Sequence, residues 1–326
     1  MKLHPLPLLS RLDDYQKQAD QLLEDGQRKI TRWYEFESWP ALADYVEAVT
    51  RADSPVFEFE SAVEAVISGD LAALESSLKK SPELARARSI RKHRATLLHY
   101  VAANGVEDYR QKSPKNAARV AEMLLRAGAE VDALAEMYGG QATTMNMLVS
   151  STPPAESGVQ VALVETLLDF GAAMEGSEAP LMTALAFGHR AAAEALVRRG
   201  AKVDNIAAAA GLGRVADARR MLETSDAHSR HLALALAAQH GHVEAVRLLL
   251  DAGEDPNRYN PKGSHAHSTP LHQAALAGHD AVVRLLVERG AKLDIQDTMY
   301  HGTPLGWAKH GGRVQTEQYL RAHGAA

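Results

Sequence analysis

Few side chains in this sequence stand at a spacing that serves chemistry. His265 and His267 are separated by one residue, so on an extended strand both imidazoles project to the same side and could share a metal ion. Such a site needs further ligands, and Asp297 and His301 are the residues that could complete it. The alternative, which we favour, is a solvated hairpin tip, and we therefore expect no bound metal.

A second group lies in the segment 106–116, VEDYRQKSPKN. Glu107, Tyr109 and Arg110 place an acid, a phenol and a guanidinium within a few residues. Such a set could orient a small polar ligand, with Arg110 as the clamp for a carboxylate or phosphate. The alternative interpretation is a solvated extension of a helix.

Sequence motifs of common enzymes are missing from this chain. It has no Gly-x-Ser-x-Gly elbow, no His-Glu-x-x-His and no Walker loop. It also has no cysteine, which excludes a thiolate nucleophile, a disulfide framework and a cysteine-based zinc site. We expect a non-catalytic protein without a cofactor, although a catalytic set scattered along the chain stays open.

Charge and hydropathy restrict the partners. The net charge of the 326-residue chain is −5, and we find no basic block of the kind that follows phosphates, so nucleic acid is not expected. The first residues, MKLHPLPLLSRLDDY, do not make a secretory signal, and no apolar run reaches the roughly 18 residues that a membrane span needs. These features predict a cytoplasmic protein that does not bind membranes.

The elements that would position these residues are best defined between Thr269 and Ala291, TPLHQAALAGHDAVVRLLVERGA. Thr269 can cap a helix whose first residue is a proline, and Gly278 ends that helix. A second helix follows, and Gly290 closes it as a left-handed cap. Two helices with so few large apolar residues cannot bury their own faces, so copies must stack on both sides.

This segment resembles the ankyrin repeat, whose unit of about 33 residues is a β-turn followed by two antiparallel helices. The next copy begins at Thr303 and has Gly306 where the motif has histidine. The resemblance implies an all-α solenoid of stacked helix-turn-helix repeats with β-hairpin fingers. It also implies that the motif histidines, His99 and His272, bond to the turn of their own repeat.

Weaker copies of the pattern predict a domain of seven or eight repeats over 55–326, which is irregular between 106 and 160. Further insertions lie at 137–141, 151–158 and 258–268. Residues 1–54 are predicted to form a helical N-terminal cap, because terminal repeats need a polar outer face. Its segment 33–42 looks like one that often precedes ankyrin arrays in bacterial proteins.

In the family, the exposed side of the inner helices and the hairpin tips form a concave binding surface. Aromatic and apolar residues on a face that should be wet mark a recognition surface. The resulting contact candidates are Tyr100, Asn104, Tyr138, Phe187, His240, Tyr259, Gln273, Tyr300 and Trp307. The alternative is that some such positions, Met147 and Leu236 in particular, are core residues of repeats with another register.

The sequence therefore predicts a monomeric, non-catalytic scaffold that binds a protein or peptide on the concave surface. The alternative is a small-molecule-binding protein or atypical enzyme, with a site formed by the insertions in repeats two and three. An enclosed pocket there would favour the small ligand, whereas an open groove would favour a macromolecule.

Overall fold

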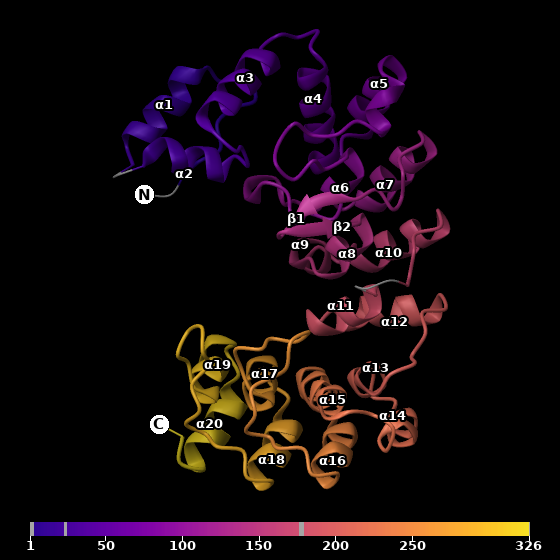
Figure 1. Cartoon of the computed structure of the whole chain (residues 1–326), viewed down its shortest axis with the longest axis vertical. Coiled ribbons are helices and arrows are strands. Elements are labelled where there is room, and N and C mark those ends of the chain that lie inside the picture. Colours follow the sequence, from indigo (N-terminus) through magenta and orange to yellow (C-terminus); the bar gives the residue numbers. More distant parts are fainter. Residues whose placement is uncertain (1–2, 23–24, 176–178, 326) are drawn as a thin grey trace. The chain divides into compact units, whose positions relative to one another are not determined.

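The structure is a computed structural model that describes residues 3–22, 25–175 and 179–325 (Figure 1). Its internal contacts divide the chain into two compact units, which we name unit 1 (1–173) and unit 2 (174–326). Each unit is described by itself below.

Unit 1 consists of short helices and one small hairpin. Its elements are α1 (Leu12–Asp20), α2 (Gly26–Trp33), α3 (Trp39–Val49), α4 (Pro55–Ser68), α5 (Leu71–Lys80), η1 (Pro82–Ala85), α6 (Leu97–Tyr100), η2 (Asp108–Arg110), α7 (Ala117–Arg126), β1 (Ala135–Met137), β2 (Gly140–Ala142), α8 (Thr144–Val149), α9 (Thr152–Glu156) and α10 (Gln160–Asp169). The strands β1 and β2 pair antiparallel, with Ala135 opposite Ala142.

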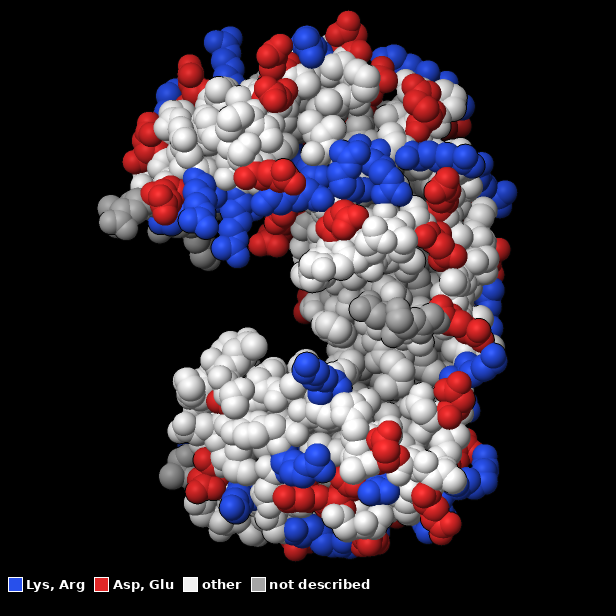
Figure 2. All heavy atoms as spheres, in the orientation of Figure 1, with Lys and Arg blue, Asp and Glu red and all other residues white. Residues whose placement is uncertain are grey.

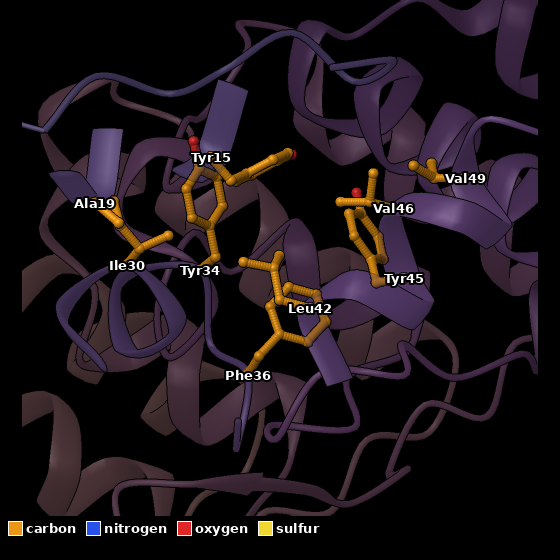
Figure 3. Close-up of a cluster of buried hydrophobic side chains, with 9 residues drawn as sticks. All are labelled: Tyr15, Ala19, Ile30, Tyr34, Phe36, Leu42, Tyr45, Val46 and Val49. Carbon is orange, nitrogen blue, oxygen red and sulfur yellow. The ribbon is translucent and has the colours of Figure 1, made fainter. Parts of the chain in front are cut away.

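The first three helices of unit 1 lie where the apolar pattern predicted them. Ser38 accepts the N–H of Ala41 and so caps α3, whose second residue is Pro40. The three helices share a core of nine buried side chains, which Figure 3 shows: Tyr15, Ala19, Ile30, Tyr34, Phe36, Leu42, Tyr45, Val46 and Val49. The boundary at residue 54 between a cap and a repeat array stays a prediction.

The remaining helices of unit 1 form the pairs α4 with α5, α6 with α7 and α8 with α10. The insertion expected at 151–158 lies between α8 and α10 and interrupts the third pair. It contains the short helix α9, which tolerates Pro153 and Pro154 because a proline in the first helical turn removes no helical hydrogen bond.

Unit 2 is more regular and contains five helix pairs in its described part. They are α11 (Pro180–Ala186) with α12 (Arg190–Arg198), α13 (Ile206–Gly211) with α14 (Val215–Met221), α15 (Ala227–Gln239) with α16 (Val243–Asp251), α17 (Pro270–Ala277) with α18 (Asp280–Glu288), and α19 (Pro304–His310) with α20 (Val314–Ala322). Among the described residues, β1 and β2 are the only strands and all other regular elements are helices, so the predicted all-α class is confirmed. None of the helices described is long and apolar enough to cross a membrane.

The turn between the two helices of a pair packs against the next pair. Gly241 has a φ of +77°, and an added Cβ there would lie 2.7 Å from Nδ1 of His279. His279 in turn donates from Nε2 to the carbonyl of Gln239, at 2.9 Å. Arg313 repeats this arrangement one pair later, since its Nε donates to the carbonyl of Leu276 at 2.8 Å. Glycine is therefore required at the turn for its conformation and for the close approach.

The alanine-rich helix α13 brings its two neighbours together. It has the sequence IAAAAG, and an added Cβ on Gly211 would lie 3.2 Å from Leu236 and 3.3 Å from Leu185. His240, at the end of α15, donates from Nε2 to the carbonyl of Leu185 in α11, at 2.8 Å. Small side chains in α13 thus let α15 hydrogen-bond directly to α11.

Candidate functional site

An open groove with a volume of about 610 Å³ runs over the inner helices of unit 2. Its lining residues come from four of the five helix pairs and their connecting segments, and the pair of α13 with α14 contributes none of them. They are Phe187, Gly188, Arg190, Gln239, His240, His265, His267, Gln273, Leu276, Ala277, His279, Tyr300, Trp307 and Arg313. Figure 2 shows few charged side chains over α17 and α19, in contrast to the charged surface over α16 and α18.

The insertion 258–268 supplies one wall of the groove. The N–H of Asn260 donates to the carbonyl of Ser268 at 2.8 Å and so closes the loop. Burial lowers the pKa of His265 in this loop. The ring of His267 lies 5.7 Å from that of Trp307 and 6.0 Å from that of Tyr300, between centroids. The insertion therefore adds two imidazoles to an aromatic surface.

Asp297 fixes the aromatic end of the groove. Its carboxylate accepts Nε1 of Trp307 at 2.9 Å and the backbone N–H groups of Met299, Tyr300 and Gly302 at 2.9, 2.6 and 2.8 Å. Burial alone would raise the pKa of Asp297, but these four donated hydrogen bonds outweigh it and hold the pKa well below its usual value. The indole of Trp307 is thus held in place by an ionised carboxylate.

His240 lines the groove, and the ring of His272 lies 5.2 Å from that of Trp307, between centroids. Burial lowers the pKa of His240 to about 4, and burial also lowers that of His272. In His272, Nδ1 accepts the N–H of Thr269 at 3.2 Å, so the proton is on Nε2, which donates to Gly302 at 3.1 Å. The motif histidine thus bonds to its own turn, as the resemblance implied. His99 makes the same contact with Thr96.

Seven of the residues selected from the sequence line this groove. They are Phe187, His240, His265, His267, Gln273, Tyr300 and Trp307. Tyr259 is not among the lining residues; it is 42% exposed, and its hydroxyl donates to the carbonyl of Gln296 at 2.7 Å. In unit 1, the hydroxyl of the exposed Tyr138 donates to Oδ1 of Asn104 at 2.5 Å. Those two residues form a separate polar pair.

The expectation that Tyr100 lies on an exposed face is wrong. Its side chain is fully buried, with its ring centroid 6.0 Å from that of His93 and 6.5 Å from that of Phe59. Met147 and Leu236 are buried too, so the alternative of core residues holds for them. In unit 1, the helix α6 has only four residues, all of which are buried. Phe59 of α4 and His93 from the segment before α6 pack against the Tyr100 ring on the side that was expected to face solvent.

Four buried charged residues form an ion cluster in unit 1: Glu60, Arg91, Glu107 and Arg110. Arg110 Nη1 lies 2.5 Å from Glu60 Oε2 and 3.0 Å from Glu107 Oε1. Arg91 pairs with Glu107 through Nε and lies 3.3 Å from Glu60. Burial alone would raise the pKa of Glu60, but the charges of Arg110 and Arg91 outweigh it and lower the pKa. Two arginines and two glutamates compensate each other here.

The predicted small-ligand set of Glu107, Tyr109 and Arg110 is therefore not an open site. Glu107 and Arg110 are already paired within the ion cluster, and Arg110 Nη2 also binds Glu64 at 2.8 Å. Tyr109 packs its ring 5.1 Å from that of Trp33. The insertion packs against the N-terminal helices through Tyr109. Its buried charges are tolerated there because partners of opposite charge are buried with them.

The histidine pair of the insertion has no third ligand. The ring centroids of His265 and His267 lie 5.9 Å apart, nearly perpendicular. In the part of the chain that the structure describes, no group of three or more His, Cys, Asp or Glu side chains could hold a metal ion. Asp297, one of the residues considered as a completing ligand, is already saturated by the hydrogen bonds given above.

Sequence reasoning missed Arg190 and Arg313 as groove residues, and Glu60 and Arg91 as members of the ion cluster. A signal for Arg313 was present, because it follows a turn glycine as His279 does. For the cluster there was none, since Glu60, Arg91 and Glu107 are distant in sequence.

Comparison with known proteins gives one family. The family described as "Ankyrin repeats (3 copies)" matches residues 155–260, 205–297 and 234–326, which together cover more than half of the chain. Cyclin-dependent kinase 4 inhibitor B of Bos taurus is 31% identical over 118 residues, which cover 27% of this chain and 89% of that protein. The crystal structure of the human ASB11 ankyrin repeat domain is similar at 22% identity and a TM-score of 0.41, and covers 79% of this chain and 96% of that chain.

Proposed function

The chain belongs to the ankyrin repeat family, and from that premise we propose that it is a non-catalytic scaffold which binds a protein or peptide in the groove of unit 2. One observation carries the proposal. Phe187 and Tyr300 border the groove with 54% and 72% of their surfaces exposed. Aromatic side chains gathered at an open groove are the usual anchors of an interface.

The family supports the same proposal. Ankyrin repeats typically serve as protein-interaction modules, and stacked repeats offer an extended concave surface for that purpose. The bovine relative is by its name an inhibitor of a protein kinase. The proposed mechanism is binding by a rigid surface rather than a chemical reaction. Pre-organised side chains favour such binding because they lose little entropy on association.

We also propose that residues 1–54 cap the repeat array of 55–326 and that the chain acts as a monomer. The support for the cap is the buried core that its three helices share, together with the hydroxyl of Tyr45, which donates to Glu60 of α4 at 3.3 Å. Tyr45 therefore connects the proposed cap to the ion cluster.

Site-specific photo-crosslinking in the native cell tests the groove. A photoreactive phenylalanine analogue replaces Phe187 or Tyr300, and a third variant carries it at Arg247, on α16 and outside the groove. We expect one protein to crosslink from both groove positions and not from position 247. Equal labelling from all three positions would refute a groove partner.

A further inference from the structure

The charged side chains that line the groove are basic, although the chain as a whole is acidic. The whole sequence carries five more acidic than basic side chains. Among the described residues that line the groove, by contrast, there is no Asp or Glu, and the charged members are Arg190 and Arg313. A ligand with negative charge therefore complements the groove.

Both arginines keep hydrogen-bonding capacity. Arg190 donates from Nε to Glu194 at 2.8 Å, and Arg313 donates from Nε to the carbonyl of Leu276 at 2.8 Å. Within the described residues, neither guanidinium makes a further hydrogen bond through its terminal nitrogens. Each can therefore still offer two N–H groups to a carboxylate, which is the geometry of a bidentate pair.

His279 lies within the influence of both guanidiniums. Burial lowers the pKa of His279, and the charges of Arg313 and Arg190 lower it further. The imidazole is already engaged, since its Nε2 donates to Gln239. Positive charge in this part of the groove thus belongs to the two arginines, because their charges disfavour protonation of His279.

The aromatic end of the groove calls for an apolar group. Trp307, Tyr300 and His267 form one contiguous aromatic surface, with adjacent ring centroids within about 6 Å of each other. Phe187 leaves its ring exposed at the other end, beside Arg190. Burying these rings under a ligand side chain would contribute the favourable part of binding.

We propose that the groove binds an acidic peptide segment that carries an aromatic or large aliphatic residue. Carboxylates would pair with Arg190 and Arg313, and the apolar residue would cover Trp307 and Tyr300. The proposal rests on the proposed function, because it names the chemistry of the partner of that same groove. An extended segment suits an open groove whose lining comes from four helix pairs. Single arginines, rather than an arginine cluster, favour carboxylates over a phosphorylated residue.

Selection from a random peptide display library against the full chain tests this chemistry. We expect the enriched peptides to combine Asp or Glu with Phe, Tyr, Trp or Leu. Changing their acids to Asn or Gln should weaken binding about tenfold or more, and added salt should weaken it as well. Enrichment of basic or uncharged peptides, preference for a phosphoserine version, or no enrichment at all would overturn the proposal.

A charge swap provides the matched control. The double variant Arg190→Glu with Arg313→Glu should lose the acidic peptide and bind a version in which Lys replaces each acid, whereas Arg247→Glu should behave as the wild type. A melting curve shows whether the variants are folded, and the salt series on the wild type needs no variant. Crosslinking at Phe187 and Tyr300 without enrichment of acidic peptides would refute this inference alone, while failure of both would refute the proposed function too.

Discussion

Units 1 and 2 both carry an insertion with polar and aromatic residues, and the two insertions have opposite fates. In unit 1, segment 106–116 turns inward, and its Glu107 and Arg110 are almost completely buried. In unit 2, segment 258–268 stays at the surface, where His265 and His267 line the groove. Opposite charges within segment 106–116 can compensate each other inside a fold, whereas segment 258–268 contains basic residues and no acid that could compensate them.

The comparison teaches that a mixture of residue types does not identify a binding site. The set in unit 1 looked more like a ligand clamp, because it has an acid, a base and a phenol. Each of these groups finds a partner within the chain. The aromatic and cationic set in unit 2 has fewer partners, and it is the set that remains available.

Deleting residues 1–54 should have the largest effect on this comparison. Arg91 donates to the carbonyl of Tyr34 at 2.6 Å and lies 4.7 Å from the ring centroid of Phe36 and 4.6 Å from that of Tyr45. Without these groups, we expect unit 1 to lose on the order of 5 kcal/mol, comparable to the stability of a small domain, and to aggregate. Urea unfolding followed by hydrogen exchange measures the two units separately. A soluble, equally stable truncation would make the segment an independent module.

A buried glutamate from each unit gives the next test. Glu107→Gln should destabilise unit 1 by about 3–5 kcal/mol, because it leaves two buried arginines undercompensated. Glu254→Gln in unit 2 should cost about 1 kcal/mol, since its partners Arg230 and Arg258 are partly exposed to water. Equal losses in chemical denaturation would mean that the ion cluster is no more important than a surface pair.

Acid should first lower the stability of both units, and at still lower pH it should affect unit 1 more than unit 2. Burial lowers the pKa of His99 in unit 1 and of His240 in unit 2 to about 4. Between pH 6.5 and 4 the unfolded histidine binds a proton and the folded one does not, so stability falls as the pH falls, by roughly 3 kcal/mol for each histidine.

The pKa values of Glu60 and Glu107 are lowered in the folded state, mainly because the charges of Arg91 and Arg110 overcome the effect of burial. The stability that they contribute is present above the unfolded pKa of about 4.3 and is lost at more acid pH, so unit 1 should continue to weaken there. Urea titrations from pH 7 to 3 measure both slopes. His240→Gln should flatten only the slope of unit 2.

Turn glycines distinguish a flexible neighbour from a fixed one. Gly241→Ala brings its Cβ to 2.7 Å from His279, which is held by a hydrogen bond, and should cost about 2–3 kcal/mol. Gly105→Ala in unit 1 meets the thioether of Met137, which can move, and should cost about 1–2 kcal/mol. Gly290→Ala meets nothing and measures the left-handed strain alone, at about 1 kcal/mol. Thermal melts should reproduce this order.

The smallest effect is expected for removal of a hydroxyl group. The hydroxyl of Tyr100 is buried and has no hydrogen-bond partner among the described residues, so Tyr100→Phe should be neutral or stabilise unit 1 by up to about 1 kcal/mol. Tyr300→Phe, at the exposed groove, should change stability by less than about 0.5 kcal/mol. A marked destabilisation by Tyr100→Phe would reveal a hydrogen bond to the ion cluster.

Local signals in the sequence were sufficient for the helix pairs. Thr269, Gly278 and Gly290 each act on the adjacent backbone, and the structure has a helix start, a left-handed turn and a left-handed cap at these positions. The sequence also selected Phe187, Tyr300 and Trp307, which line the groove, because the register of unit 2 is regular.

What could not be predicted depends on contacts between distant residues. Tyr100 was misplaced because the residues that cover its ring, Phe59 and His93, belong to other parts of the chain and have no place in the repeat pattern. Arg110 was misjudged because its counter-ions, Glu60 and Glu64, come from a helix some fifty positions earlier. Charge pairing of this kind has no periodicity.

The hydrogen bonds between turns of unit 2 have a direction, and this has a mechanical consequence. Arg313 donates to Leu276, and His279 donates to Gln239, so in both cases the later pair holds the earlier one. A pulling force applied at α20 would load the Arg313 bond before that of His279. Rupture of the Arg313 bond would free the turn of the last helix pair while the His279 bond, one pair earlier, is still in place.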